Sequence, residues 1–289
     1  MPKPAKRFAK IYTEITTVCN LNCEFCHGTS RPAKFISAED FALFARKTAP
    51  FTDHVYLHVM GEPLLHPQLG ELIDIASDEG LKVSITTNGT LLKKQLPLLL
   101  SKAEKLYKIS VSLHSFEANG GVDADAYLED CFASAAALGA AGVISVLRLW
   151  NLDGGSLSSP KNSYNGEILD RLKRYFPDVW SENRKGQKIG DRVYLEYGKR
   201  FDWPDLGEKK RENAHGFCYA MKDHVAVLCD GRVLPCCLDA DGVIELGNLH
   251  TQSLEEILDG EPARSIAEGF ANNILVHPLC RSCRARGLL

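Results

Sequence analysis

The sequence has few of the features that direct a chain to a membrane or to a polyanion. Its 289 residues contain no apolar run long enough to span a bilayer. The basic N-terminal segment, residues 1–10, is followed by no apolar stretch, which argues against a secretion signal. The formal net charge is only -3, so no overall charge attracts nucleic acid or an acidic membrane. We therefore expect a cytoplasmic protein with neither a membrane nor a nucleic acid as its partner.

Cysteine, in contrast, is abundant. The ten cysteines fall mainly into two clusters, three between residues 19 and 26 and six between residues 218 and 283, and Cys131 stands alone. In a chain without a secretion signal, metal or catalytic roles are more common for cysteines than disulfides. The clustering therefore indicates two sites of metal binding or catalysis.

Six strand-like runs alternate with helical patterns along most of the chain. The runs cover residues 10–17, 54–60, 82–88, 107–114, 143–150 and 191–197. Alternating strands and helices favour an α/β fold with a parallel sheet and right-handed crossovers. Six units of this length predict a partial (β/α)6 barrel, similar to a TIM barrel that stops short of eight units.

These strands alternate polar and apolar residues, although parallel strands covered on both faces are usually apolar throughout. Ser110 and Ser112, for example, alternate with Ile109 and Val111. We expect the apolar face to carry the helices and the polar face to line the barrel lumen, which suggests a cavity for a polar ligand. An antiparallel sheet with one wet face is the alternative.

A charged segment with two glycines, within residues 205–217, indicates a linker at the end of the barrel. Beyond it, an apolar stretch predicts a hairpin that turns at Asp230 and Gly231. We therefore divide the chain into a barrel, residues 1–204, and a small C-terminal domain of a β-hairpin and helices, residues 205–289.

Three cysteines, Cys19, Cys23 and Cys26, follow the first predicted strand directly. They lie in the first strand-to-helix loop, on the face where such barrels keep their active sites. Three thiolates on one tight loop can bind three irons of a four-iron cluster and leave the fourth iron open to an exogenous chelator. A zinc site is the alternative, although zinc usually takes four ligands and only His27 stands near.

The CxxxCxxC spacing, with Phe25 before the last cysteine, resembles the signature of the radical S-adenosylmethionine (SAM) superfamily. This resemblance implies a 4Fe-4S cluster whose open iron binds the amino and carboxylate groups of SAM. It also implies that the reduced cluster donates one electron, which splits SAM into methionine and a 5′-deoxyadenosyl radical that abstracts hydrogen from a substrate. A reductant such as flavodoxin or ferredoxin would supply that electron.

Three strand ends carry candidates for SAM binding. Residues 60–63 resemble the family's Gly-Gly-Glu-Pro element, whose glutamate binds the SAM amino group, so Glu62 takes this role although Met60 replaces the first glycine. Asn88 and Ser112 end the third and fourth strands, where the family contacts the ribose or methionine part of SAM. Turn chemistry is the alternative for Asn88.

Arg148 lies on the inward face of the fifth strand. A buried arginine requires an anion, and the SAM carboxylate would suit bidentate pairing. An ion pair with Glu14 or Glu196 across the lumen is the alternative. His58 and His114 are expected to line the substrate cavity.

The second cysteine cluster supplies four candidate ligands, Cys218, Cys236, Cys280 and Cys283. Their spacing resembles the SPASM/twitch module of many radical SAM enzymes. No cysteine follows Cys283 in the sequence, which resembles the twitch form of this module with its single cluster. The resemblance implies an auxiliary 4Fe-4S cluster with all four irons ligated. Cys237 could substitute for Cys236, and zinc is the alternative metal.

Together these patterns predict a radical SAM enzyme, an oxidoreductase or maturase, that acts on a peptide or small-molecule substrate by net oxidation or crosslinking. Two other classes stay open. One is a non-catalytic iron-sulfur electron carrier, and the other is a zinc-binding interaction protein.

Overall fold

The computed structural model describes residues 6–116, 123–152, 164–206 and 213–286. Its centre is an eleven-stranded sheet in the order β11-β10-β9-β1-β2-β3-β4-β5-β8-β7-β6. Six of these strands are the predicted barrel strands, and neighbours among them pair in parallel. They are β1 (Lys10–Thr13), β2 (His54–Tyr56), β3 (Lys82–Thr87), β4 (Leu106–Ser112), β5 (Ile144–Leu152) and β8 (Val193–Lys199). The predicted α/β partial barrel is therefore confirmed.

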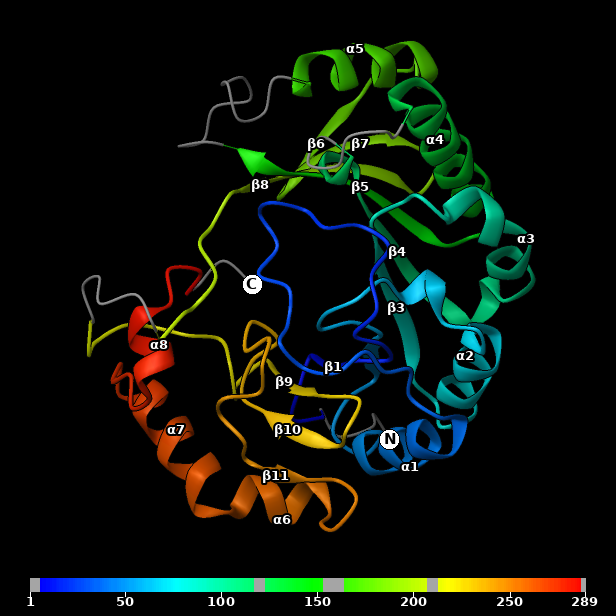
Figure 1. The fold of residues 1–289 in the computed structure, drawn as a ribbon. Coiled ribbons are helices and arrows are strands. Elements are labelled where there is room, and N and C mark those ends of the chain that lie inside the picture. Colours follow the sequence, from blue (N-terminus) through cyan, green and yellow to red (C-terminus); the bar gives the residue numbers. More distant parts are fainter. Residues whose placement is uncertain (1–5, 117–122, 153–163, 207–212, 287–289) are drawn as a thin grey trace, which may run out of the picture.

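Helices cover the outer face of the curved sheet, as Figure 1 shows along its rim. The helices between the parallel strands are α1 (Ala38–Thr48), α2 (Leu69–Asp78), α3 (Leu92–Ser101), α4 (Ala124–Ala140) and α5 (Asn165–Tyr175), with short 3-10 turns η1 (Pro63–Leu65), η2 (Ala103–Lys105) and η3 (Leu113–Ser115). α1 begins where the Ser37 hydroxyl accepts a hydrogen bond from the backbone N–H of Asp40. Outward strand residues such as Ile11, Val55 and Ile85 are almost fully buried in the apolar core with the helices. This apolar burial stabilises the barrel.

A hairpin that the sequence patterns did not predict extends the sheet beyond β8. Its strands, β6 (Ser181–Asn183) and β7 (Gly186–Gly190), pair antiparallel, and β7 pairs antiparallel with β8. All residues of β6 are exposed and polar, so no period-two apolar pattern marks the segment. The turn of this hairpin carries Lys185, which lines the barrel lumen.

The C-terminal region adds its strands to the same sheet. β9 (His224–Val227) pairs in parallel with β1, β10 (Arg232–Leu234) returns antiparallel to β9, and β11 (Gly247–Asn248) pairs antiparallel with β10. The predicted hairpin is therefore confirmed. Its turn contains Gly231 with a φ of 84°, a backbone conformation that favours glycine.

Three helices complete the C-terminal region and lie beside the β9–β11 strands in Figure 1. They are α6 (Leu254–Asp259), α7 (Glu261–Ala271) and α8 (Pro278–Ser282). The boundary expected between residues 204 and 205 stays a prediction, because residues 207–212 of the expected linker lie outside the described residues.

No helix in the described part of the chain combines the length and the apolar character that a membrane-spanning segment requires.

Candidate active site

One cavity of about 420 Å³ occupies the barrel lumen and brings together the residues predicted for SAM binding. Its lining includes Cys19, Cys23, Cys26, Glu62, Asn88, Ser112 and Arg148. Small-molecule sites typically have volumes of roughly 300–1,000 Å³. The polar lumen expected from the strand alternation is therefore present, while the role of each lining residue stays a prediction.

Distant parts of the chain hold the three-cysteine loop in place. The indole N–H of Trp203 donates a hydrogen bond of 3.1 Å to the carbonyl oxygen of Phe25. The side-chain amide of Asn88 lies 3.9 Å from the sulfur of Cys19. None of the ten cysteines, all of which lie in the described residues, forms a disulfide, so no covalent bond keeps the sulfurs of this loop from binding a metal.

The spacing of the sulfurs fits clusters better than single ions. The ligand atoms around one tetrahedral zinc ion lie about 4 Å apart. Among the described residues, only His224, Cys236 and Cys237 have ligand atoms within 4.8 Å of one another, and neither predicted cysteine set does. Because a four-iron cluster is wider than one ion, its thiolates stand further apart. The zinc alternative therefore gains no support from the geometry of either set.

Glu62 is a buried carboxylate at the lumen, only 2% exposed. It accepts hydrogen bonds from the hydroxyl of Thr87 at 2.7 Å and from the backbone N–H groups of Asn88 at 2.7 Å and Leu64 at 3.0 Å. No cationic side chain of the described residues pairs with it. Burial raises the pKa of Glu62 to about 7, although the three hydrogen bonds act in the opposite direction. A cationic ligand would therefore bind here favourably.

Gly61 brings the Glu62 segment against the start of the cysteine loop. Its φ is 75°, and a Cβ at this position would lie 2.4 Å from the carbonyl oxygen of Thr16 and 2.9 Å from that of Val18. Glycine is the residue that permits both this φ and this approach. Met60, which stands in place of the family's first glycine, is buried beside it.

Arg148 points into the lumen and lies over the ring of Trp150, with 4.1 Å between its Cζ and the ring centroid. Its Nε is buried and has no hydrogen-bond partner among the described residues. Glu196 lies beside Arg148 in the β5–β8 register without forming a hydrogen bond to this Nε, and Glu14 binds Arg31 instead. Burial lowers the pKa of Arg148, which indicates a guanidinium that lacks a close anion.

Glu14 joins three segments of the chain. β1 ends at Thr13, earlier than expected, so Glu14 lies beyond the strand and not on the lumen. Its fully buried carboxylate accepts two hydrogen bonds of 2.6 Å from the guanidinium of Arg31. It also accepts the backbone N–H groups of Met60 at 3.2 Å and Cys229 at 3.3 Å. The loop that carries the three cysteines is thus tied to the C-terminal region.

Asn88 makes the turn contact that was considered for it, and its role in SAM binding stays a prediction. Its Oδ1 accepts a hydrogen bond of 3.0 Å from the backbone N–H of Thr90, which is turn chemistry. Its Nδ2 donates to Oδ1 of Asn20 at 3.0 Å, inside the cysteine loop. Ser112 stands at the end of β4, where it faces the cavity.

Two histidines line the same cavity, as the sequence predicted. Burial lowers the pKa of His58 to about 3, and the nearby charges of Arg148 and two lysines lower it further. Burial likewise lowers the pKa of His114 to about 4. Both rings are therefore neutral at physiological pH.

The lumen also contains polar residues that the sequence reasoning missed. They are Lys10, Lys108, Lys185, Trp203 and Cys237. Lys108 stands two and four residues before Ser110 and Ser112, on the face already assigned to the lumen, so the period-two pattern could have revealed it. No such pattern marks Lys185 or Trp203, which reach the lumen from an unpredicted turn and from a segment after β8.

A second cavity, of about 40 Å³, is lined by the cysteines predicted to hold the auxiliary cluster, Cys218, Cys236, Cys280 and Cys283. Apolar side chains such as Phe270 and Leu275 surround them. Burial raises the pKa of Cys280 to about 12 and the pKa of Cys283 to about 11, and the neighbouring thiols raise both further. Thiolates crowded into such a site require a compensating metal, which fits a fully ligated cluster.

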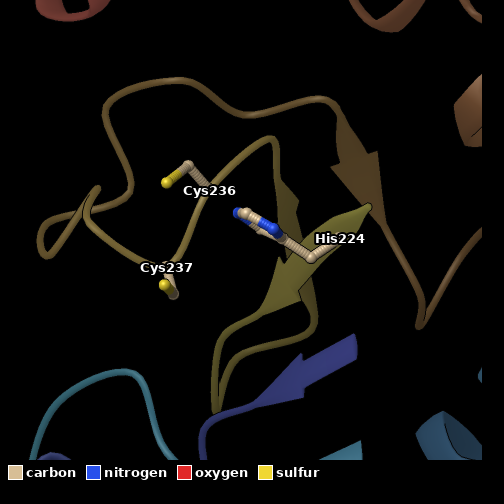
Figure 2. Close-up of side chains that lie close together, drawn as sticks. All are labelled: His224, Cys236 and Cys237. Carbon is tan, nitrogen blue, oxygen red and sulfur yellow. The ribbon is translucent and has the colours of Figure 1, made fainter. Parts of the chain in front are cut away.

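The adjacent residues Cys236 and Cys237 face different cavities. Cys236 lines the four-cysteine cavity, whereas Cys237 lines the lumen. Figure 2 shows both near the ring of His224, whose two nitrogens have no hydrogen-bond partner among the described residues. These three side chains could hold an ion, but only if Cys236 left the four-cysteine set. The placement favours Cys236 over Cys237 as the auxiliary ligand, and this assignment stays a prediction.

Comparison with known proteins identifies the class to which this fold and this site belong. Residues 13–143 match the model of the radical SAM superfamily, so this part of the chain is a radical SAM domain. Residues 218–284 match SPASM, an iron-sulfur cluster-binding domain. The chain thus combines a radical SAM domain with a SPASM domain. These matches confirm SAM, a 4Fe-4S cluster and auxiliary iron-sulfur binding as the cofactors.

Curated relatives resemble this chain over its barrel portion. The AdoMet-dependent heme synthase of Methanosarcina barkeri is 34% identical over 103 residues, which are 35% of this chain and 29% of that protein. A probable GTP 3′,8-cyclase of Methanococcus maripaludis is 37% identical over 103 residues, or 34% of each chain. The chain thus spans about a third of the length of these relatives.

Solved structures share the fold over nearly the whole chain. BtrN in complex with AdoMet and 2-DOIA has a TM-score of 0.60 at 16% identity and covers 96% of this chain and 94% of its own. Streptococcus suis SuiB bound to S-adenosylmethionine has a TM-score of 0.63 at 17% identity and covers 97% of this chain and 73% of its own. At these identities the likeness establishes the fold alone.

Proposed function

We propose that this chain cleaves SAM and abstracts hydrogen from a peptide or small metabolite held in the barrel lumen, for a net oxidation or a crosslink. One observation supports this most. Among the described residues, no cation pairs with the buried carboxylate of Glu62 and no partner reaches the buried Nε of Arg148, yet both groups line the cavity of the three cysteines. SAM ends in an amino acid, whose amino and carboxylate groups would complement these two side chains.

The cluster held by Cys19, Cys23 and Cys26 would supply the electron that splits SAM into methionine and a 5′-deoxyadenosyl radical. The chain's own residues position SAM and exclude water. Glu62 would accept a hydrogen bond from the SAM amino group, Arg148 would hold its carboxylate, and the walls of the lumen would shield the substrate from solvent.

We propose a broad substrate class, a peptide or a small metabolite, because the similar solved structures were determined with different bound molecules. SuiB has been solved bound to the precursor peptide SuiA, and anSMEcpe with the Kp18Cys peptide, whereas BtrN has been solved with 2-DOIA. We include a flavodoxin or a ferredoxin in the proposal as reductant, since SAM cleavage requires one electron from outside the chain.

Anaerobic reconstitution with iron and sulfide, followed by SAM and dithionite, tests the proposed function. We expect 5′-deoxyadenosine and methionine, measured by liquid chromatography, above the level of a sample without dithionite. An iron-sulfur electron carrier would hold iron but form no 5′-deoxyadenosine. A zinc-binding interaction protein would contain zinc and lack the brown absorbance of iron-sulfur clusters.

The affinity for SAM is expected to rise with pH between about 5.5 and 7. The pKa of Glu62 is about 7 in the absence of SAM, so below this pH the carboxyl must lose a proton before its carboxylate can accept a hydrogen bond from the SAM amino group. Each pH unit below 7 therefore weakens SAM binding by up to about tenfold. Equilibrium binding of SAM to the unreduced, reconstituted protein measures this dependence.

The Glu62→Gln variant isolates the group responsible for this pH dependence. A neutral amide at position 62 should weaken SAM binding and also flatten its pH profile. Glu129→Gln, at an exposed position on α4, removes the same charge away from the lumen and should leave the profile unchanged. A profile equally steep in Glu62→Gln would assign the titration to another group.

A further inference from the structure

Three lysines from separate parts of the fold meet in the lumen, and we call them the lysine cluster: Lys10, Lys108 and Lys185. Lys10 begins β1, Lys108 lies near the start of β4, and Lys185 lies in the turn between β6 and β7. On β4, Lys108 stands four residues before Ser112, which is about 13 Å along the strand. The cluster therefore extends the cavity away from the residues proposed to bind SAM.

The ammonium groups of the lysine cluster lack anionic partners. Among the described residues, none of the three forms an ion pair or donates a side-chain hydrogen bond. Instead, the Nζ atoms of Lys10 and Lys108 approach the ring of Tyr56 from 5.4 and 5.2 Å. A cation over an aromatic face is stabilised only weakly, which does not replace a counter-ion.

The lysines also repel one another. Burial lowers the pKa of Lys10, and the charges of Lys108 and Lys185 lower it further. Burial lowers the pKa of Lys108 to about 8, again with contributions from neighbouring cations, chiefly Arg148. Glu196 acts in the opposite direction on Lys108 but lies too far away for an ion pair. Lys10 and Lys108 are half-buried, whereas Lys185 is exposed. Holding two half-buried cations beside a third without an anion is unfavourable, so the arrangement favours a ligand of opposite charge.

The neutral imidazole of His58 lies close to the lysine cluster. Nδ1 of His58 is buried and has no hydrogen-bond partner among the described residues. The charges of Lys10, Lys108 and Arg148 help to keep its ring neutral. The ring can therefore offer a hydrogen bond to a ligand without adding a charge.

We propose that the lysine cluster binds an anionic group of the substrate, either a phosphate or a carboxylate. The inference rests on the proposed function, because it places a substrate in the lumen beside SAM. Glu62 and Arg148 stay with SAM in this arrangement. The substrate would then be anchored by its anionic group among the lysines, with its reacting carbon closer to the three-cysteine loop.

Calorimetric titration of the SAM-saturated, reconstituted holoenzyme tests the inference without any turnover. Inorganic phosphate and acetate serve as the two probes, each at constant ionic strength adjusted with sodium chloride. We expect at least one of them to bind. Phosphate binding alone indicates a phosphate ester as the substrate group, and acetate binding indicates a carboxylate.

Two variants test whether the anion binds at the lysine cluster. Lys10→Gln and Lys108→Gln should each weaken binding of the anion by about tenfold, since each removes one charge-assisted contact. Lys82→Gln is the matched control, because Lys82 is an exposed lysine of β3 that does not line the cavity, and its affinity should equal that of the native chain. Either Lys10→Gln or Lys108→Gln suffices if the other fails to bind iron.

The inference is overturned if neither anion binds, or if both lysine variants bind it as tightly as the native protein does. This failure differs from failure of the proposed function. A holoenzyme that forms 5′-deoxyadenosine but binds neither anion keeps the function and loses the lysine-cluster proposal. A holoenzyme that binds phosphate at these lysines but never cleaves SAM keeps the anion site and loses the function.

Discussion

A Cys26→Ala variant is expected to form no 5′-deoxyadenosine above the level of a sample without dithionite. Cys26 is exposed, so its replacement should leave the packing of the barrel intact. The two remaining thiols of the loop, Cys19 and Cys23, would hold too few irons to retain the cluster, and iron would be lost from the site. Iron analysis and chromatography of the reaction products measure both effects, while the iron of the C-terminal site should remain.

Cys131→Ala is the matched control for this experiment. Cys131 is a buried thiol on α4 whose sulfur lies 3.9 Å from the carbonyl oxygen of Gly89, and burial raises its pKa to about 12. Cys131 lines neither of the two cavities that hold the predicted cysteine sets, so the variant should keep its full iron content and its SAM cleavage. If Cys26→Ala cleaved SAM as well as this control does, the three-cysteine loop would not be the site of the reaction.

The largest effect on stability is expected from Arg31→Met. The variant would leave the carboxylate of Glu14, whose side chain is 0% exposed, without its bidentate partner. Removing one member of a buried ion pair typically lowers the free energy of unfolding by about 3–5 kcal/mol, because the remaining charge is buried and uncompensated. Urea unfolding of the cluster-loaded protein, followed anaerobically, measures the change.

Two further variants test whether the loss of stability in Arg31→Met comes from the unpaired carboxylate of Glu14. Arg46→Met removes a guanidinium that is 70% exposed and 3.6 Å from Glu79, so we expect a loss of no more than about 1 kcal/mol. The double variant Arg31→Met with Glu14→Gln removes both charges and should recover part of the stability that the single variant loses. A single variant as stable as Arg46→Met would show that Glu14 does not depend on Arg31.

Much of the site could be predicted from sequence because its signals are local. The three cysteines share one loop, and the polar faces of the strands follow a period of two that a twisted parallel sheet preserves. The positions of Glu62 and Arg148 on one lumen follow from these patterns, once the strands are known to be parallel.

Other features depend on contacts between distant segments, which no local pattern records. The pairing of Glu14 with Arg31 requires two loops to meet, and it removes one of the two carboxylates that had been considered as partners of Arg148. The β6–β7 hairpin forms from exposed polar residues whose main partner is β8.

The pairing of β9 with β1 also prevents β1 from pairing with a strand of another chain. Without β9, the backbone N–H and C=O groups along one side of Lys10–Thr13 would be free to pair with a strand of another chain. A barrel produced without the C-terminal region would therefore have an unpaired edge strand at β1 and tend to aggregate. In this chain, the region that carries the second set of thiols also covers this sheet edge. Gain or loss of the auxiliary cluster would therefore alter solubility as well as chemistry.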